Sequence, residues 1–483
     1  MDYEAVIGLE VHAELLTKTK IFCSCPAKFG AEVNTHVCPV CLGLPGVLPV
    51  LNKNVVELSL KAAVAINCNV PNECKFDRKN YFYPDLPKAY QITQYDQPVG
   101  KNGFLEIDLN GKKKIVNITR IHIEEDAGKL VHAGSDRLSG STYSLADYNR
   151  AGVPLVEIVS EPEIRSSEEA KLYMEELRSI LVCAGVCDGK MEEGSMRCDA
   201  NVSIRQRGTE KFGTRVEIKN LNSFRSLQRA IDYEIQRQKD AIQYGERIVQ
   251  ETRLWDENKS VTITMRTKEE AEDYRYFPDP DLFSISISPE WLKRIVDELP
   301  ELPTKKRERY VKDYLLSDYD ARVLVNSTDL ISFFEESVNS GLNAKTVTNW
   351  LSVDITAYLN EKKLELKNTK LTPQNFSELL MLIEKGTISG KIAKEILPEI
   401  IETGESATKI VERKGSTQIN DTSELLKMVQ DIIEKNPKEV TDYLGGKEKL
   451  LGFFVGQAMK QSKGRANPEV LNGIVKDELN KLR

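Results

Sequence analysis

The sequence predicts an α+β fold in which a β-rich N-terminal region precedes two helical regions. From residue 1 to about residue 289, β-branched and aromatic residues alternate with polar ones, and Gly, Asn and Asp interrupt these runs, as in VGKNG and LNGKK. Beyond Pro300 and Pro303 this alternation gives way to amphipathic helical periods. At roughly 150 residues per domain, a chain of 483 residues is expected to form about three domains.

Two changes in composition mark the expected domain boundaries. The segment LPELPTKKRERY ends the strand-like pattern, and the polar segment ETGESATKIVERKGST separates two helical blocks. The last block is short enough to fold as a small tail domain. We therefore predict domains at 1–295, 296–405 and 406–483.

One helix is predicted inside the β-rich region, over Ser223–Tyr244. Phe224, Leu227, Ile231 and Ile235 fall on one helical face, and Ser223 can cap the first turn. This helix should pack its apolar face against the predicted strands.

The composition excludes several classes of protein. No apolar run approaches the ~18–20 residues that cross a bilayer, so we expect no membrane role. Met1 leads within a few residues into AVIGLEVHAEL, which leaves no room for a signal or transit segment and predicts a cytoplasmic protein. The net charge of −7 argues against general coating of nucleic acid but permits a local basic patch.

Four cysteines in IFCSCPAKFGAEVNTHVCPVC have the spacing of a zinc site. Cys23 and Cys25 form one close pair, Cys38 and Cys41 form another, and cytosolic thiols stay reduced. A redox CxxC motif would leave the first pair unexplained. Because four thiolates leave no open position on the metal, we predict a structural zinc that holds the loop at 22–43. His36 lies inside this loop and could replace one thiolate.

The segment AVIGLEVHAEL places acidic and imidazole side chains on one face of a strand. Because alternate residues share a face, Glu10, His12 and Glu14 should point away from the apolar residues between them. Such a face could supply half of a Mg²⁺ or Mn²⁺ site. It could equally be the solvated face of an edge strand.

A second acidic cluster ends the strand predicted in IVNITRIHIEEDAGKL. His122, Glu124, Glu125 and Asp126 are crowded there, and adjacent like charges repel unless a cation or solvent screens them. Strand alternation pairs Glu124, not Glu125, with His122 and Arg120. Alternation often fails at a strand end, so the pattern does not decide which carboxylate binds a metal.

A predicted hairpin joins RCDANVSIR to TRVEIKN. Its polar face carries Arg197, Asp199 and Asn201 on the first strand and Glu217 and Lys219 on the second. Salt bridges across the strands explain such a face, and so does a nucleotide phosphate bound by cations near Mg²⁺. Neither a GxxxxGK[ST] nor a strand–GxGxxG–helix motif occurs, so a nucleotide would have to bind on an open sheet.

Three further segments combine cations with features that suit nucleic acid. DRKNYFYPDLPKAYQITQYDQP and DYRYFPDPDL interleave tyrosines with Arg and Lys, which suits stacking of single-stranded ends but also simple loop packing. In FFVGQAMKQSKGRANPEV, Lys460, Lys463 and Arg465 could contact an RNA backbone or merely stabilise a helix C-terminus.

Long segments of the chain resemble the GatB family, which supplies one subunit of the tRNA-dependent amidotransferases. The similar runs include VIGLEVHAEL, DRKNYFYPDLPKAYQI, IEEDAGK, NRAGVPLVEIVSEPEIRS, KMEEGSMRCDANVS, EIKNLNSF, DYRYFPDPDL and VGQAMKQSKGRANP. They extend over essentially the whole chain. The resemblance implies a cradle domain, a helical domain and a YqeY-like tail that binds the tRNA body.

The resemblance also implies an activity and its residues. The protein would use ATP and Mg²⁺ to phosphorylate the side-chain carboxyl of Glu-tRNA(Gln) or Asp-tRNA(Asn), and ammonia would then displace phosphate. The ammonia would come through a channel from a GatA-like glutaminase, with a small GatC-like protein joining the two. By position, the Mg²⁺ ligands would be Glu10, His12 and Glu125. Further candidates for the catalytic and ATP-binding sites are Glu157, Lys79, Arg197, Asp199 and Asn201.

One alternative class remains, a zinc-stapled tRNA-binding scaffold without catalysis. A scaffold has no reason to collect acids where an anionic RNA must approach, whereas a Mg²⁺ site requires them. The sequence therefore favours the enzyme, without indicating a preference between Glu-tRNA(Gln) and Asp-tRNA(Asn).

Overall fold

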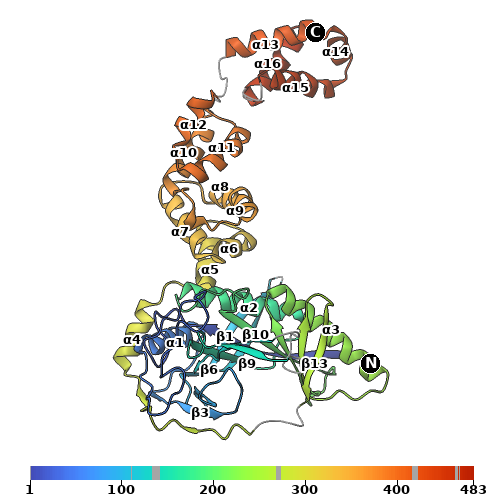
Figure 1. Ribbon diagram of the computed structural model, residues 1–483. Coiled ribbons are helices and arrows are strands. Elements are labelled where there is room, and N and C mark those ends of the chain that lie inside the picture. Colours follow the sequence, from blue (N-terminus) through green and yellow to red (C-terminus); the bar gives the residue numbers. More distant parts are fainter. Residues whose placement is uncertain are drawn as a thin grey trace. The chain divides into compact units, whose positions relative to one another are not determined.

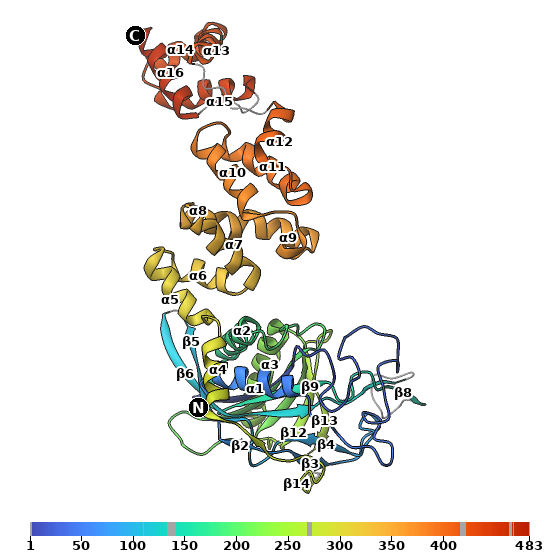
Figure 2. The ribbon, with the colours of Figure 1, turned by 90° about the vertical axis from the view of Figure 1, so that its left-hand side faces the viewer.

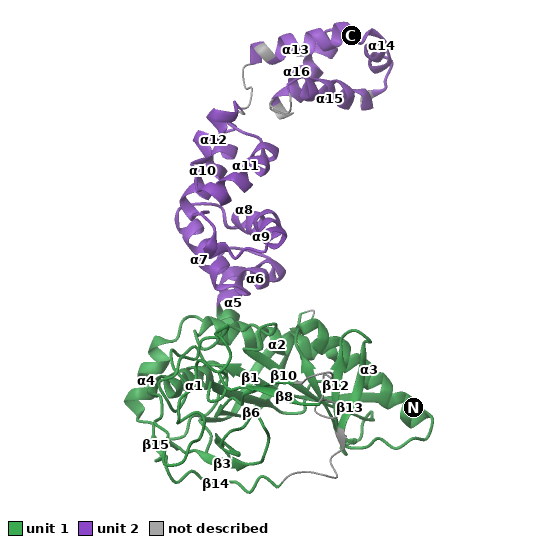
Figure 3. Cartoon of the chain, viewed as in Figure 1, with its two compact units in different colours: residues 1–305 green, residues 306–483 purple. Residues whose placement is uncertain are grey.

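The computed structural model describes residues 2–109, 111–132, 142–267, 273–415, 422–462, 466 and 468–482. The chain forms two compact units, Met1–Lys305 and Lys306–Arg483 (Figure 3). The first combines strands with helices and the second is helical, which confirms the predicted α+β class. In the described ranges no helix of either unit is both long and apolar enough to span a membrane.

The first unit is built on a large mixed sheet. Its strands are β1 (Tyr3–Glu14), β2 (Glu73–Cys74), β3 (Asp77–Asn80), β4 (Tyr90–Thr93), β5 (Gly100–Leu109), β6 (Lys112–Glu125), β7 (Lys129–His132), β8 (Ser144–Asp147), β9 (Pro154–Ser160), β10 (Met196–Gln206), β11 (Val216–Leu221), β12 (Glu251–Asp256), β13 (Val261–Thr267), β14 (Phe277–Pro278) and β15 (Ile285–Ser286). Its helices are α1 (Lys53–Ala65), α2 (Ser167–Cys183), α3 (Phe224–Gln243) and α4 (Pro289–Glu298), and α5 (Pro303–Asp313) begins at its end.

The main sheet has the strand order β13-β12-β11-β10-β1-β9-β6-β5. Neighbouring strands run antiparallel except β11 and β12, which are parallel. Helices α2 and α3 lie over one face, and the small sheet β14-β3-β4 lies on the other side (Figures 1 and 2). Among the described residues, no helix covers the opposite, polar face of β1.

The alternation predicted for AVIGLEVHAEL is present in β1. Ile7, Leu9 and Val11 belong to the hydrophobic core beneath the helices, while Glu10 and His12 are only half-buried. Burial of the apolar set fixes which face each polar residue occupies, because each step along a strand reverses the side chain.

The predicted helix over Ser223–Tyr244 is α3. The Ser223 hydroxyl accepts a hydrogen bond from the backbone N–H of Ser226 (3.0 Å), and Leu227 and Ile231 are fully buried against the sheet. A serine cap and an apolar stripe at helical spacing therefore predicted the element and its start correctly.

The second unit contains only helical elements in its described ranges. They are α6 (Asp318–Val325), α7 (Thr328–Asn339), α8 (Ala344–Asn349), the π-helical segment η2 (Trp350–Ile355), α9 (Thr356–Lys362), η3 (Leu366–Asn368), α10 (Pro373–Glu384), α11 (Gly390–Thr403), α12 (Ala407–Lys414), α13 (Thr422–Lys435), α14 (Pro437–Leu444), η4 (Glu448–Leu450), α15 (Leu451–Gln461) and α16 (Pro468–Lys481), after most of α5. Two hydrophobic clusters form here, one within 310–411 and one within 425–479. The division at 295 and 405 stays a prediction.

Candidate active site and cysteine centre

The polar face of the main sheet carries a row of four candidate site residues. His122 on β6 pairs with Glu157 on β9, Glu157 pairs with His12 on β1, and His12 pairs with Arg197 on β10. Side chains in register on adjacent strands lie about 4.5–5.5 Å apart and so interact directly. The strand order therefore assembles residues from four distant parts of the sequence.

Carboxylates surround the two histidines of this row. The His12 Nε2 atom lies 3.4 Å from Glu124 Oε1 and 3.5 Å from Glu157 Oε2. The His122 Nε2 atom lies 3.3 Å from the same Glu157 oxygen. Burial alone would lower the pKa of His12, but its hydrogen bond to Glu157 and the charges of Glu157 and Glu124 raise that pKa to about 9.

The same interactions lower the pKa of Glu157. Burial would raise the pKa of Glu157, but the charges of His122 and His12 and their hydrogen bonds hold it well below the usual range. Positive charge on these imidazoles thus stabilises the carboxylate form of Glu157.

His12, Glu124 and Glu157 together fit a divalent cation. Each offers one donor atom, and these atoms lie within 4.8 Å of one another. Imidazole nitrogen and carboxylate oxygen suit Mg²⁺ or Mn²⁺, and a cation there would replace the charge of a protonated His12.

A second acidic group adjoins the first on the same face. Glu10, Asp199 and Glu217 also bring their donor atoms within 4.8 Å. Lys219 forms ion pairs with Asp199 and with Glu217 (2.9 Å), and the Asn201 amide donates to Glu10 (2.9 Å). The ammonium of Lys219 already neutralises part of the negative charge of this group.

The carboxylate of Glu125 does not lie in one cluster with the side chains of Glu10 and His12. Both of its carboxylate oxygens lie 2.6 Å from Lys88 Nζ, and one accepts a hydrogen bond from the backbone N–H of Ile92 (2.8 Å). The carboxylate beside His12 is that of Glu124, the residue which strand alternation favoured. Glu124, Glu217 and Lys219 were not among the site residues that the resemblance implied, although the alternation of β6 and of the TRVEIKN strand places them on the polar face.

The remaining predicted residues of the first unit lie near this face but in different roles. Arg197 donates to Asp126 (Nη2 to Oδ2, 2.9 Å). The Lys79 Nζ atom lies 4.7 Å from the centre of the Tyr274 ring and 5.6 Å from that of Tyr81, as a cation over two aromatic rings.

The two tyrosine-rich segments come together beside the carboxylates. Strand β14 pairs with β3, and the rings of Tyr95 and Tyr276 stack with centres 4.2 Å apart. Burial above all, together with the charges of Glu157 and Glu124, raises the pKa of Tyr276 to about 12, against the opposing charge of Arg120. The aromatic segments therefore border the polar face, where they were expected to serve either binding or packing.

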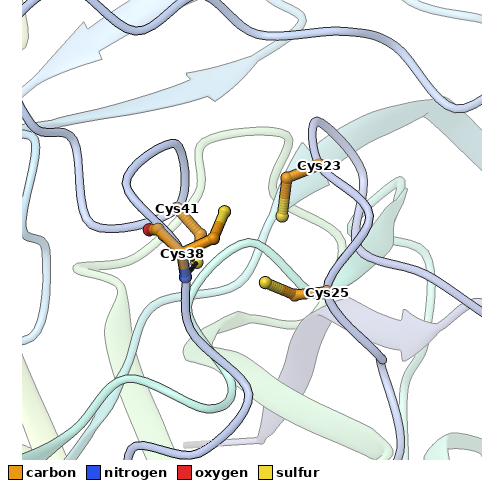
Figure 4. Close-up of side chains that lie close together, drawn as sticks. All are labelled: Cys23, Cys25, Cys38 and Cys41. Carbon is orange, nitrogen blue, oxygen red and sulfur yellow. Dashed lines mark hydrogen bonds between the residues drawn. The ribbon is translucent and has the colours of Figure 1, made fainter.

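The four cysteines of the loop converge as predicted from their spacing. Their sulfur atoms lie within 4.8 Å of one another, and the two pairs face each other from separate segments of the loop (Figure 4). The Cys38 backbone N–H donates to Cys41 Sγ (3.1 Å), which gives the second pair a knuckle turn. The cluster can bind a metal such as zinc.

A buried lysine lies beside the cysteine cluster and favours the thiolate form of Cys41. Lys20 is completely buried, and its ammonium lies 3.5 Å from Cys41 Sγ and 3.2 Å from the Tyr148 carbonyl oxygen. A hydrogen bond from the Cys23 thiol, the Cys38 N–H and the Lys20 charge lower the pKa of Cys41. Four thiolates on Zn²⁺ carry a net negative charge, which a neighbouring ammonium would offset.

Glu14 should make the stability of the first unit depend on pH. Burial and the charge of Asp126 raise the pKa of Glu14 to about 7, against the opposing charges of Arg197 and Arg150. A pKa raised on folding gives stability that is complete below about pH 4 and is lost as the pH rises through 7. We expect Glu14→Gln to match the parent at pH 4 and to exceed it by about 1–2 kcal/mol at pH 8, after allowance for solvent screening of a half-buried group.

Denaturant unfolding of both proteins across this pH range measures the effect. Glu290→Gln, which alters an exposed carboxylate at the start of α4, is the control and should not change the pH profile between 5 and 8. Equal pH profiles for the parent and Glu14→Gln would contradict the assignment.

In the tail, only part of the predicted basic patch can be placed. Lys460 is exposed in the last turn of α15. Lys463 and Arg465 lie outside the described residues.

Comparisons with known proteins agree over nearly the whole chain. A family described as "GatB/GatE catalytic domain" matches residues 5–293, and one described as "GatB domain" matches 332–479. The B chain of the aspartyl/glutamyl-tRNA(Asn/Gln) amidotransferase of Carboxydothermus hydrogenoformans is 55% identical over 481 residues, covering 100% of both chains. The protein of the same name from Brevibacillus brevis is 54% identical, covering 99% of each. The chain therefore belongs to the GatB family of tRNA-dependent amidotransferases.

Proposed function

We propose that this chain is the part of a ligase complex that activates and amidates the side-chain carboxyl of Glu-tRNA(Gln), Asp-tRNA(Asn) or both. The observation that carries the proposal is the group of His12, Glu124 and Glu157 beside Glu10 on the polar face of the main sheet. A kinase-like step needs positioning and positive charge more than covalent chemistry, and a metal held by these donors would supply that charge.

The reaction has two balanced steps. A carboxylate oxygen of the aminoacyl group attacks the γ-phosphorus of ATP, the bond to the ADP oxygen breaks, and an acyl phosphate forms. Ammonia then attacks the acyl carbon, phosphate departs, and the nitrogen loses a proton to give the amide. Phosphorylation is required because a free carboxylate has no good leaving group.

Two ligand sets are possible for Mg²⁺. The geometry favours His12, Glu124 and Glu157, whereas the family resemblance implied Glu10, His12 and Glu125. Arg197, Lys79, Asp199 and Asn201 stay proposed contacts of ATP or the aminoacyl end, and Lys219 joins them because it lies among the carboxylates of Glu10, Asp199 and Glu217.

The partners are proposed from the family. A GatA-like glutaminase would supply ammonia through a channel, and a small GatC-like protein would join the two chains. The tail 406–483, with Lys460, Lys463 and Arg465, would hold the tRNA body. Zinc bound by the four cysteines would be structural, and we expect the complex in the cytoplasm, where thiols stay reduced.

The direct test is amide formation on Glu-tRNA(Gln) with ATP, Mg²⁺ and free ammonia, with and without the GatA-like and GatC-like partners. We expect ammonia-dependent product in the complex and its loss in His12→Ala, with tRNA binding kept within a few-fold. Binding of tRNA without product under every combination would instead favour the non-catalytic scaffold.

A further inference from the structure

Arg120 is a cation on the polar face whose guanidinium has no protein acceptor in the described part of the chain. It lies on β6 and is half-buried, and its Nε atom is fully buried without a hydrogen-bond partner. Buried polar groups are paired in the great majority of cases, and an orphaned donor on a charged group requires an explanation.

The backbone directs Arg120 onto the polar face. A β-bulge lies between Ile118 and Arg120 in the pairing of β6 with β9. Val116 and Ile118 face the core before the bulge, and Ile121 and Ile123 face it afterwards. The extra residue thus reverses the alternation and places Arg120 on the face of His122 and Glu124, as bulges near active sites often do.

Three of the other cations around this face are already paired with carboxylates, whereas Lys79 lies over aromatic rings. Lys88 is paired with Glu125 (2.6 Å), Arg197 with Asp126 (2.9 Å) and Lys219 with Glu217 (2.9 Å). Arg120 has no such ion pair among the described residues, so its charge is available to a ligand.

Arg120 faces Glu10 across a single strand. Arg120 pairs with Val159 on β9, and Val159 pairs with Glu10 on β1. Two strand spacings separate the two backbones by about 10 Å. The intervening Val159 is short and apolar, and it lines a cavity together with Glu10, Asn201, Ser160 and Pro162. This cavity leaves room for a small group beside Val159 and Glu10, and Val159 lies on the strand next to that of Arg120.

The charges and the hydrogen-bond donors at this position favour a phosphoryl group as the ligand. The carboxylates of this face repel any phosphate that approaches without a cation, and in phosphoryl transfer the charge is spread over several oxygens. A guanidinium offers planar paired donors that match phosphate geometry, whereas an ammonium is a point charge.

We propose that Arg120 binds the phosphoryl group that passes from ATP to the aminoacyl carboxylate. This inference rests on the proposed function and adds a residue to it. Arg120 donates to the phosphoryl oxygens while the carboxylate oxygen bonds to phosphorus and the bond to ADP breaks. Arg120 continues to donate hydrogen bonds to the same oxygens when phosphate leaves the acyl carbon.

The test compares Arg120→Met and Arg120→Lys with the parent in the complete complex. We expect Arg120→Met to lower kcat/KM for ATP by about 10²–10³-fold, with aminoacyl-tRNA binding unchanged. Arg120→Lys should recover only part of the loss, because the charge remains but the paired donors do not. The thermal midpoint of Arg120→Met should be equal or higher, since the variant removes a buried donor without a partner, a result that a merely structural arginine would not give.

Arg205→Met is the matched control. Arg205 lies on β10 of the same sheet, and its Nε atom is paired with Glu4 (2.7 Å), so its loss should leave the kinetics unchanged. Weaker tRNA binding with a shallower salt dependence and unchanged ATP kinetics in Arg120→Met would assign Arg120 to an RNA phosphate and overturn the inference. Unchanged kinetics with a lower thermal midpoint would make it structural.

The parent complex separates this inference from the function on which it rests. If the parent forms no ADP in response to aminoacyl-tRNA, the proposed function fails and the inference fails with it. If the parent forms ADP and amide while Arg120→Met does so equally well, only the role of Arg120 is refuted.

Discussion

Glu124→Gln is expected to lower ATP-dependent amide formation in the complete complex by at least about 100-fold. The change keeps the size of the side chain but removes the charge that faces His12 at 3.4 Å, and it replaces one of three donors within 4.8 Å of one another by a neutral, weaker amide oxygen. Affinity for the activating metal should fall with the rate, so high Mg²⁺ or Mn²⁺ should restore part of the activity. Initial rates across a metal titration provide the measurement.

Glu125→Gln is the matched comparison, because it makes the same change at the next residue. Its carboxylate is bound to Lys88 at 2.6 Å and is buried, so the substitution leaves a partly buried ammonium unpaired. We expect a loss of stability of about 3 kcal/mol with a metal dependence like that of the parent. If Glu125→Gln shifts the metal titration and Glu124→Gln does not, the ligand set implied by the resemblance is correct and the one favoured by the geometry is wrong.

The second large effect is expected at the cysteine loop. Cys38→Ser should abolish zinc binding and lower the free energy of unfolding by about 3 kcal/mol or more, because the metal joins two segments that have little regular secondary structure of their own. Metal analysis of the purified protein and unfolding in denaturant measure the two quantities. Zinc retained at full stoichiometry would show that Cys38 is not a ligand.

The same variant tests whether the zinc is only structural. Protein that remains folded should keep its rate of amide formation, since four thiolates leave no site for a substrate on the metal. Cys68→Ala, outside the loop, is the control and should change stability only by the small cost of a lost sulfur. A folded Cys38→Ser protein without turnover would place the zinc in the mechanism.

The local patterns could be predicted because each depends on residues close in sequence. The apolar stripe and serine cap of α3 and the alternation of β1 are periodicities that burial enforces directly. The two cysteine pairs are likewise adjacent in sequence, and only one loop had to close to bring them together.

The choice between Glu124 and Glu125 depended on whether strand alternation continues to the end of β6, which the local pattern favours but does not establish. After the bulge, strand β6 stays in register with β9 from Arg120 as far as Glu125 and Pro154, so alternation holds to the end of the strand. Glu124 therefore shares the polar face, and Glu125 turns to Lys88. The bulge before Arg120 could not be predicted, because it is a relation between two strands distant in sequence.

The register of β1 determines both which residues enter the core and which lie on the polar face. A shift of one residue would turn Glu10 and His12 into the core and bring Leu9 and Val11 to the polar face. Such a shift would bury two ionisable groups under α2 and α3 and so would destabilise the fold. A single insertion in β1 would thus be eliminated by misfolding before it could alter substrate choice. Variation in this family should therefore concentrate in loops and in substitutions that keep the strand length.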